Sequence, residues 1–383
     1  VISPSNGGAL VEDEKSIKYY APLNYQAQDR AVTALDYQAT IAKQYPAAES
    51  ISVWGGEDND PPFYGRVMIS IKPNEGLRLT SSEKESIVGS ILKSKNIVTV
   101  RPLILDPEYT YLKVNSEVAF TAAKTGLSPE DLRVAVIRNI KNYMTNDLEK
   151  FDTNLLYSRF VDMIDDTNSS ITNNYTTVDL EKRFIPLTGQ DVYKLDFQNA
   201  LHHPHEGHSS VTSSNGFFYK IPDDPTTFDN EEQIVTAYLD DDGMGKLRLY
   251  RIDVDGNKVY FDLDCGSIDY SSGVLSFKDF YPITEPAQEV RVVVKPNKYD
   301  VTAIRNNILT MDNTDSRALT VSMVENGRAE SFRVTNTDFY TSEDNNVTNT
   351  NSGFGLTRND DASSDNSSSS SSGSGSSSSG SGY

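Results

Sequence analysis

All histidines of this 383-residue chain lie within one short run of seven residues, at His202, His203, His205 and His208. Neutral imidazole nitrogens bind zinc, copper, nickel and iron, and several rings can converge on one ion. Pro204 and Gly207 would bend the segment so that the rings approach one another. The pattern therefore predicts a candidate site for a transition metal, with these four histidines as its ligands.

Two other interpretations of the histidine run remain open. Structural zinc sites normally draw ligands from two separated segments, and one short run does not provide this. A polar loop at an interface, with imidazoles that hydrogen-bond neighbouring groups or a partner chain, explains the same residues without metal. A pH-sensitive contact is the third interpretation, because clustered imidazoles would become charged together near pH ~6.5. We favour the polar loop.

Two acidic runs resemble calcium-binding loops only in composition. They are residues 240–243, Asp-Asp-Asp-Gly, and residues 253–257, Asp-Val-Asp-Gly-Asn. A calcium loop of the EF-hand type needs regularly spaced oxygen ligands, a glycine at the sixth position and a terminal glutamate, and neither run has this set. Asp and Gly favour tight turns for steric and hydrogen-bonding reasons, so we expect acidic β-turns.

The chain shows no pattern typical of catalysis. No Gly-x-Ser-x-Gly motif is present, so a serine nucleophile of that kind is not indicated. Two carboxylates could serve a glycosidase, but among 55 acidic residues nothing marks one particular pair. We expect a non-enzymatic protein without catalytic residues and without an organic cofactor.

Composition excludes two classes of partner. The formal net charge is −20, from 55 acidic and 35 basic residues, so phosphate backbones and anionic lipid surfaces would repel the chain. No apolar run approaches the ~20 residues that span a bilayer. The single cysteine, Cys265, excludes a disulfide within one chain and suits assembly in a reducing cytoplasm. Val1 and the lack of a signal-like segment indicate a piece of a longer protein, or a processed one.

Helix and strand signals alternate in the first half of the chain. Helices are predicted to begin at Thr33, with Asp36 completing a capping box, near Ser82, with Glu85 reaching back, and at Ser128, which is followed by Pro129. Strand patterns lie between them, at residues 50–54, 66–72, 97–104 and 109–120. These signals predict small α/β sandwich units, either two of them or one that is continuous.

From residue 177 onward, strands and turns replace the helices. Residues 252–254 and 259–263 flank Asp255-Gly256-Asn257, a strong hairpin signal, and residues 268–277 indicate another strand–turn–strand unit. Residues 289–295 suit a central strand, and residues 318–324 and 329–334 a closing hairpin. The pattern predicts a mostly antiparallel β domain.

We therefore predict an α+β fold with four regions. They are an extended arm over residues 1–30, an α+β region over 31–176, a β-rich domain over 177–340 and a low-complexity tail over 341–383. The Ser/Gly-rich tail cannot bury enough apolar surface to offset its ordering entropy, so we expect it to be disordered.

Several strings in the chain resemble one protein family. The most specific are Tyr-Tyr-Ala-Pro and Gln-Asp-Arg-Ala-Val-Thr within residues 18–33, and Gly-Arg-Val-Met-Ile-Ser-Ile-Lys-Pro at 65–73. Further support comes from residues 105–109, 155–159, 268–270, 297–301 and 305–306. Together they resemble the J-like baseplate family of contractile-tailed bacteriophages, in the C-terminal portion of its large wedge protein. The Ser/Gly tail departs from the family pattern.

The resemblance implies a structural role in a virion. Members of this family are non-enzymatic; they dimerise, pair with other wedge subunits and join neighbouring wedges into the ring around the tail hub. That ring widens when the tail contracts. The implied location is the tail baseplate, assembled in the bacterial cytoplasm, with hub or sheath-initiating proteins as further partners. A tail-fibre or adhesin-type binding module is the alternative, and a glycan hydrolase of the tail is the third hypothesis.

Overall fold

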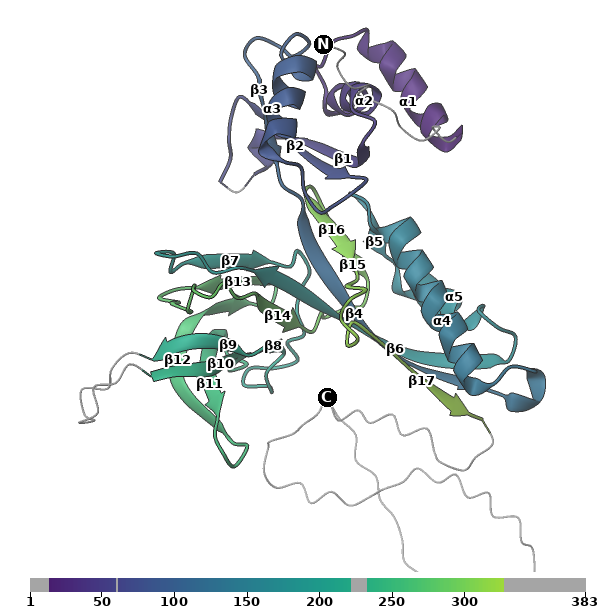
Figure 1. Cartoon of the computed structure of the whole chain (residues 1–383), viewed down its shortest axis with the longest axis vertical. Coiled ribbons are helices and arrows are strands. Elements are labelled where there is room, and N and C mark those ends of the chain that lie inside the picture. Colours follow the sequence, from purple (N-terminus) through teal and green to yellow (C-terminus); the bar gives the residue numbers. More distant parts are fainter. Residues whose placement is uncertain (1–13, 60, 222–232, 327–383) are drawn as a thin grey trace, which may run out of the picture. The chain divides into compact units, whose positions relative to one another are not determined.

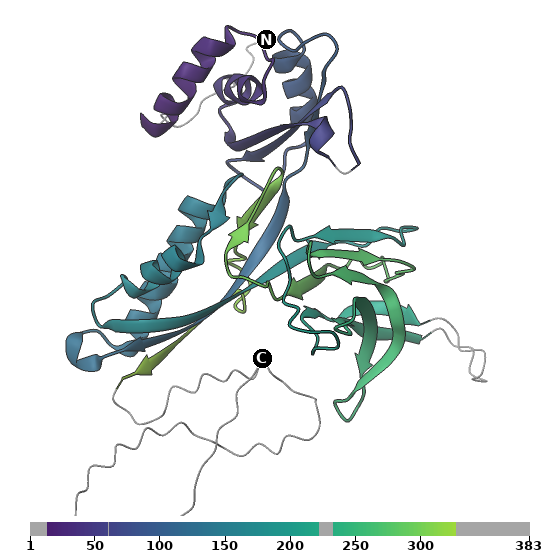
Figure 2. The ribbon, with the colours of Figure 1, turned by 180° about the vertical axis from the view of Figure 1, so that it is seen from behind.

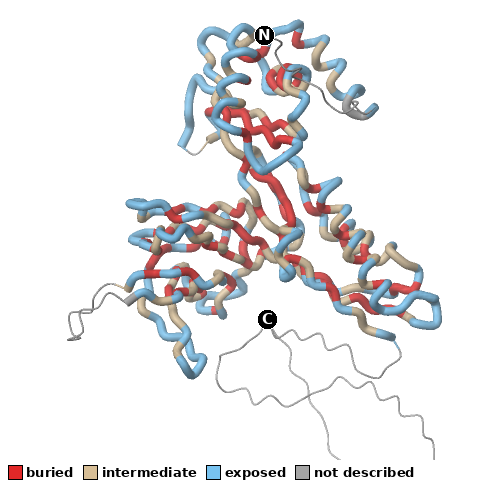
Figure 3. The backbone as a smooth tube through the Cα atoms, in the orientation of Figure 1, coloured by how far each residue is buried: buried red, intermediate tan, exposed pale blue. Residues whose placement is uncertain are grey.

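The computed structural model describes residues 14–59, 61–221 and 233–326 (Figure 1). Within these residues the buried apolar side chains form two clusters, one between Ala31 and Ile104 and the other between Leu112 and Val321. Figure 3 shows the buried positions concentrated along the strands and on one side of each adjoining helix. The chain thus builds two separate cores, and the first ends at Ile104.

The first core combines three helical segments with a three-stranded sheet. The sheet order is β1-β2-β3, with β2 antiparallel to β1 and parallel to β3. Its strands are β1 (Ala48–Gly55), β2 (Arg66–Pro73) and β3 (Arg101–Leu105), and the 3-10 turn η1 (Gly56–Asp58) follows β1. The helices are α1 (Glu14–Ala27), α2 (Ala34–Gln44) and α3 (Ser81–Ser86), which continues as the π-helical segment η2 (Ile87–Leu92).

The second core lies around two long antiparallel strands, β4 (Glu108–Phe120) and β6 (Ile171–Phe184). The sheet order is β16-β4-β6-β14-β8, and β17 also pairs with β4. The added strands are β8 (Thr212–Ser214), β14 (Val290–Val294), β16 (Asn307–Thr310) and β17 (Leu319–Glu325). Both β16 and β17 run parallel to β4, so segments about two hundred residues apart share one strand.

Helices cover one face of this long strand pair. They are α4 (Pro129–Tyr143), continued by η4 (Met144–Leu148), and α5 (Tyr157–Asp165), and both lie beside β4 and β6 in Figures 1 and 2. Leu132, Val136 and Ile140 recur on the buried face of α4, as a helical period requires. Short elements complete this part: η3 (Ala122–Lys124) and a two-stranded pairing of β5 (Asn154–Leu155) with β15 (Val301–Thr302).

A six-stranded antiparallel sheet forms the rest of the second core. Its order is β7-β13-β12-β11-β10-β9. The strands are β7 (Tyr193–Asp196), β9 (Phe217–Ile221), β10 (Gln233–Asp241), β11 (Lys246–Ile252), β12 (Lys258–Asp269) and β13 (Val274–Phe277). Leu239, Leu247 and Leu249 face the core, while their sequence neighbours lie on the opposite side of the sheet.

The predicted α+β class, with helix–strand units first and a mainly antiparallel β region after them, is confirmed. The expectation of an extended arm is wrong for residues 14–27, which form α1. Pro22 lies inside this helix and lacks the N–H that an interior helical residue donates, and this obscured the pattern. The residues before Glu14, the second strand of the closing hairpin and the predicted tail lie outside the described residues.

The predicted division into four domains stays a prediction. β6 runs without interruption across residues 176 and 177, where a boundary was expected. The apolar alternation of this strand begins before residue 177 and continues after it, because both parts pair with β4.

Candidate functional site: the histidine loop and the acidic turn

The four histidine rings gather around His208. Its ring centroid lies 4.9 Å from that of His203, 6.3 Å from that of His205 and 6.4 Å from that of His202. His208 is buried, with 7% of its surface exposed. The segment that contains these residues, 202–208, is here called the histidine loop.

The hydrogen bonds of His208 indicate which nitrogen carries the hydrogen in the neutral ring. Its Nδ1 lies 2.6 Å from the carbonyl oxygen of Ser209, and a carbonyl can only accept, so Nδ1 carries the hydrogen. In the neutral ring Nε2 is then an acceptor, and it lies 2.8 Å from Nδ1 of His203. His203 Nδ1 therefore donates to His208, and these two nitrogens satisfy each other.

Tyr270 connects the histidine loop to a buried carboxylate. The ring of His203 stacks on the ring of Tyr270, with centroids 4.3 Å apart and planes 6° from parallel. The Tyr270 hydroxyl donates to Oδ2 of Asp241 at 2.8 Å. Burial, followed by the charge of Asp241, raises the pKa of Tyr270 well above its ordinary value. The phenol is thus held as a hydrogen-bond donor.

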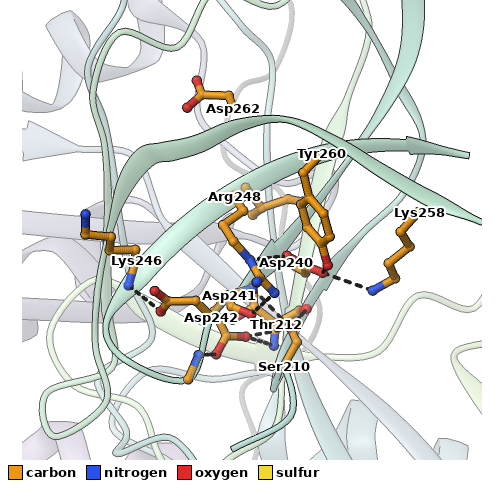
Figure 4. A network of polar contacts seen from close by, with 12 residues as sticks. Ser210, Thr212, Asp240, Asp241, Asp242, Lys246, Arg248, Lys258, Tyr260 and Asp262 are labelled. Carbon is orange, nitrogen blue, oxygen red and sulfur yellow. Dashed lines mark hydrogen bonds and ion pairs between the residues drawn. The ribbon is translucent and has the colours of Figure 1, made fainter. Parts of the chain in front are cut away.

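Asp241, at the end of β10, is fully buried and accepts hydrogen bonds from five groups. Figure 4 labels two of the donor residues, Ser210 and Thr212. Oδ1 accepts from the Ser210 hydroxyl at 2.7 Å and from the amides of Val211 and Thr212 at 2.8 Å each. Oδ2 accepts from the Tyr270 hydroxyl and from the Gly243 amide at 3.2 Å. The carboxylate therefore fastens the segment after the histidine loop to the turn between β10 and β11.

Asp240 points to the other side of the same strand and binds three different groups. It accepts from Nε of Arg248 at 3.0 Å, from Nζ of Lys258 at 2.9 Å and from the hydroxyl of Tyr260 at 2.8 Å (Figure 4). Burial opposes the charge of Lys258, but the hydrogen bond and charge of Asp240 outweigh it and raise the lysine pKa. The two adjacent aspartates thus act on opposite faces of the sheet: Asp241 binds the segment after the histidine loop, and Asp240 binds side chains of β11 and β12.

The backbones of the histidine loop and the acidic turn touch at Gly243. Gly207 N–H donates to the carbonyl oxygen of Gly243 at 3.0 Å. A Cβ built on Gly243 would lie 2.3 Å from the oxygen and 2.7 Å from the nitrogen of His208, and the residue has φ +71°. Only glycine fits this contact without a shift of the backbone.

This arrangement supplies rigidity rather than reactivity. Ser210 Oγ bonds to Asp241 and also accepts from the Asp241 amide at 3.1 Å, so its geometry is fixed by the turn. In the second acidic run, Oδ1 of Asp253 accepts from the amides of Asp255 and Asn257, as an acidic turn requires. These bonds agree with the interpretation of the second acidic run as a turn. In the first run, Asp240 and Asp241 end strand β10, and only Asp242 and Gly243 lie in the turn that follows.

The four histidines of the loop are the predicted metal ligands. Across residues 14–59, 61–221 and 233–326, no group of three or more His, Cys, Asp or Glu side chains has a geometry that could hold a metal ion. His203 and His208 hydrogen-bond each other, while Nδ1 of His205 lies 3.0 Å from the carbonyl oxygen of Glu206. The metal site remains a prediction, and the polar loop remains the interpretation that we favour.

Sequence reasoning found the histidine run and the turn but missed what joins them. Asp241 and Tyr270 lie far from His203 in the chain, so spacing alone gave no sign that they meet. The signal that was present is the Asp-Asp-Asp-Gly string, whose glycine marks the close approach. Cys265 is buried, as expected for a strand residue, and burial raises its thiol pKa.

Comparison with known proteins identifies the first part of the chain. Residues 33–105 match the family described as baseplate structural protein gp6, C-terminal domain I, and residues 108–183 match C-terminal domain III of the same protein. The chain is also 28% identical over 176 residues to the baseplate wedge protein gp6 of Enterobacteria phage T4. Residues 33–105 and 108–183 are thus similar to C-terminal domains of the gp6 family of baseplate structural proteins.

The domain I match coincides with the first core, and the domain III match covers the first part of the second core. The domain I match ends at Leu105, the last residue of β3, and the domain III match covers β4, α4, α5 and nearly all of β6. The aligned part covers 46% of this chain and 26% of the phage T4 protein. The matches to structural proteins of the phage tail baseplate confirm the predicted resemblance and the predicted non-enzymatic class. Among the described helices, none is long and apolar enough to cross a membrane.

Proposed function

We propose that this chain is a structural subunit of a phage tail baseplate wedge, which dimerises and links neighbouring wedges into the ring around the hub. The ring rearranges when the tail contracts. Other wedge subunits are its partners, together with hub or sheath-initiating proteins at the inner edge. The observation that carries the proposal is the succession of gp6 domains I and III along one chain.

The first core offers a surface for a second copy. Five large apolar side chains are exposed on neighbouring segments: Val32, Phe63, Tyr64, Ile97 and Val98. These segments adjoin because the Ala31 amide donates to Lys95 O at 2.9 Å and the Arg101 amide donates to Gly65 O at 3.1 Å. We call these five side chains the domain I patch.

The domain I patch has properties of a protein interface. Val98 is 99% exposed and Tyr64 81% exposed, so leaving them in water forgoes the gain from burying apolar surface. Exposed apolar groups that cluster commonly mark contacts with other proteins, and aromatic residues often anchor them. A contact between identical patches would give the twofold symmetry of a dimer.

Sedimentation equilibrium of the purified chain tests this proposal. We expect a dimer whose dissociation constant rises at least about tenfold when Tyr64→Ser and Val98→Glu are combined. The control combines Leu127→Ser with Val134→Glu, which changes two exposed apolar residues outside the patch. A chain that stays monomeric at high concentration, or a control as disruptive as the patch variant, would count against dimerisation through this surface.

A further inference from the structure

The outward side of strands β9 to β12 carries a second group of apolar side chains. Ile234, Ile252 and Phe218 are 63%, 50% and 48% exposed, and Tyr260 is 36% exposed. Tyr238 and Tyr250 are partly buried between them. We call this group the tyrosine face; its members are Phe218, Ile234, Tyr238, Tyr250, Ile252 and Tyr260.

Strand register brings these side chains together. Tyr238 pairs directly with Tyr250, and Tyr250 pairs with Tyr260, so three tyrosines stand side by side on adjacent strands. The rings of Tyr238 and Tyr250 stack with centroids 5.6 Å apart. Side chains directly opposite on neighbouring strands share one face of the sheet, so the tyrosines form a continuous row.

Glycine shapes the edge of this row. A Cβ built on Gly216 would lie 3.2 Å from two ring carbons of Tyr238 and 2.8 Å from Cγ2 of Thr236. The missing side chain thus leaves room for the tyrosine ring to lie close to the backbone before β9. The row is held in place by the surrounding backbone.

The charges on the tyrosine face differ in sign from those of the chain as a whole. Arg248 and Lys258 share this side of the sheet, and both bind Asp240, the carboxylate beneath them. Within this group of described side chains, two cations with one carboxylate leave a positive charge on a chain of net charge −20. Charge complementarity therefore favours an acidic partner over a basic one.

The cations also restrict what can stack on the rings. Lys258 Nζ lies 4.4 Å from the ring centroid of Tyr250, and the Arg248 guanidinium carbon lies 4.6 Å from that of Tyr260. Both rings thus already have a cation over one face, which disfavours the flat stacking that sugars need. Tyrosine and arginine are, in contrast, the residues most enriched where proteins bind one another.

We propose that the tyrosine face is a docking surface for a segment of another protein. This segment carries acidic residues and at least one large aromatic or aliphatic side chain, which anchors it. The apolar side chains of the tyrosine face cover the anchoring side chain of the bound segment. Arg248 and Lys258, which Asp240 holds in place, form ion pairs with the carboxylates of that segment. That the bound segment belongs to another baseplate subunit rests on the proposed function; the binding surface itself does not.

The test uses the intact chain and a set of overlapping synthetic peptides from the other baseplate proteins of the same phage. We expect acidic peptides with a hydrophobic anchor to bind, and the same peptides with Asn and Gln in place of Asp and Glu to bind at least about tenfold more weakly. Binding should also weaken as salt is added, because exposed charges are screened.

A matched pair of variants locates the binding surface. Phe218→Ser combined with Ile234→Ser should lower affinity at least about tenfold. Met244→Ser combined with Leu263→Ser changes residues 69% and 62% exposed outside the tyrosine face, and should leave affinity within about twofold. Thermal unfolding of each variant checks that it is folded.

Three results would overturn this proposal: no peptide binds, the amide peptides bind as tightly as the acidic ones, or the two variants behave alike. Failure here leaves the dimer untouched, because the sedimentation assay depends on the domain I patch. Loss of dimerisation with peptide binding retained would instead contradict only the proposed function.

Discussion

Asp241 shows at the scale of a residue how a carboxylate without chemistry to perform can still be indispensable. It is buried and accepts from five donors, two of which are side-chain hydroxyls. Asp241→Asn would turn an NH₂ group toward amide or hydroxyl donors, because an amide has only one acceptor oxygen. We expect the free energy of unfolding to fall by about 3 kcal/mol.

Urea denaturation measures this loss, with Asp255→Asn as the control. Asp255 is exposed in the turn after β11, so its substitution should change stability by less than about 0.5 kcal/mol. Equal effects of the two substitutions would show that the hydrogen bonds of Asp241 do not contribute as inferred.

Asp269 offers a test of electrostatics in an exposed turn. Hydrogen bonds from Ser272 and then Ser271 lower its pKa from 3.8 to about 2. Because the folded-state pKa is depressed, the stabilisation is present above the unfolded pKa and is lost as pH falls from near 4 through about 2. In Ser272→Ala, NMR titration of the Asp269 carboxyl should give a higher pKa. An unchanged titration would contradict this assignment.

The histidine loop allows the metal prediction to be decided directly. In the polar-loop interpretation, His203 Nδ1 and His208 Nε2 are satisfied by each other. Zinc or nickel should then leave the melting temperature of the purified protein unchanged. A saturable rise in melting temperature, abolished by His203→Ala, would establish metal binding instead, since a ligand of the folded state stabilises it.

At the scale of elements, substitutions at two glycines of the β region distinguish the cost of a steric clash from the cost of a left-handed backbone conformation. Gly243 and Gly256 both have positive φ, +71° and +86°, but only Gly243 has backbone atoms close to where a Cβ would lie. Gly256→Ala should cost about 1 kcal/mol for the left-handed conformation alone. Gly243→Ala should cost at least about 3 kcal/mol, because the histidine loop must also move.

Thermal and urea unfolding of both glycine variants measure this difference. A Gly243→Ala protein as stable as Gly256→Ala would mean that the histidine loop yields easily and that its contact with the acidic turn is weak.

Elements with local signals could be predicted, and those that depend on distant partners could not. The capping box at Thr33 and Asp36 and the Ser128 cap with Pro129 are confirmed. The helix expected near Ser82 begins at Ser81, and its capping box is formed by Thr80 and Glu83. The prediction used Ser82 and Glu85, which have the same spacing two residues further along the chain. The hairpin around Gly256 is also confirmed.

The parallel pairing of β16 and β17 with β4 had no counterpart in the sequence analysis. Short apolar runs indicate strands but not their partners, and these partners are about two hundred residues away. The same limit applies to the site: four adjacent histidines were evident, whereas their contacts with Tyr270 and the Gly243 turn arise only from the fold.

At the scale of the whole molecule, the features combine into a part built for assembly. The chain is strongly acidic, its buried carboxylates Asp240 and Asp241 are held by internal hydrogen bonds, and its exposed apolar groups include the domain I patch and the tyrosine face. Mixed polar and apolar contacts suit an interface that must rearrange, because the alternative state stays accessible. Two such surfaces on one chain would serve the proposed role in a ring, where each copy needs complementary patches.

The most direct test of this account is an electron cryomicroscopy map of the intact phage tail. The account predicts density for this chain in a ring around the baseplate hub, with two copies in contact through the domain I patch and the tyrosine face against another subunit. Density in a trimeric fibre away from that ring, or absence of the chain from the baseplate, would contradict it.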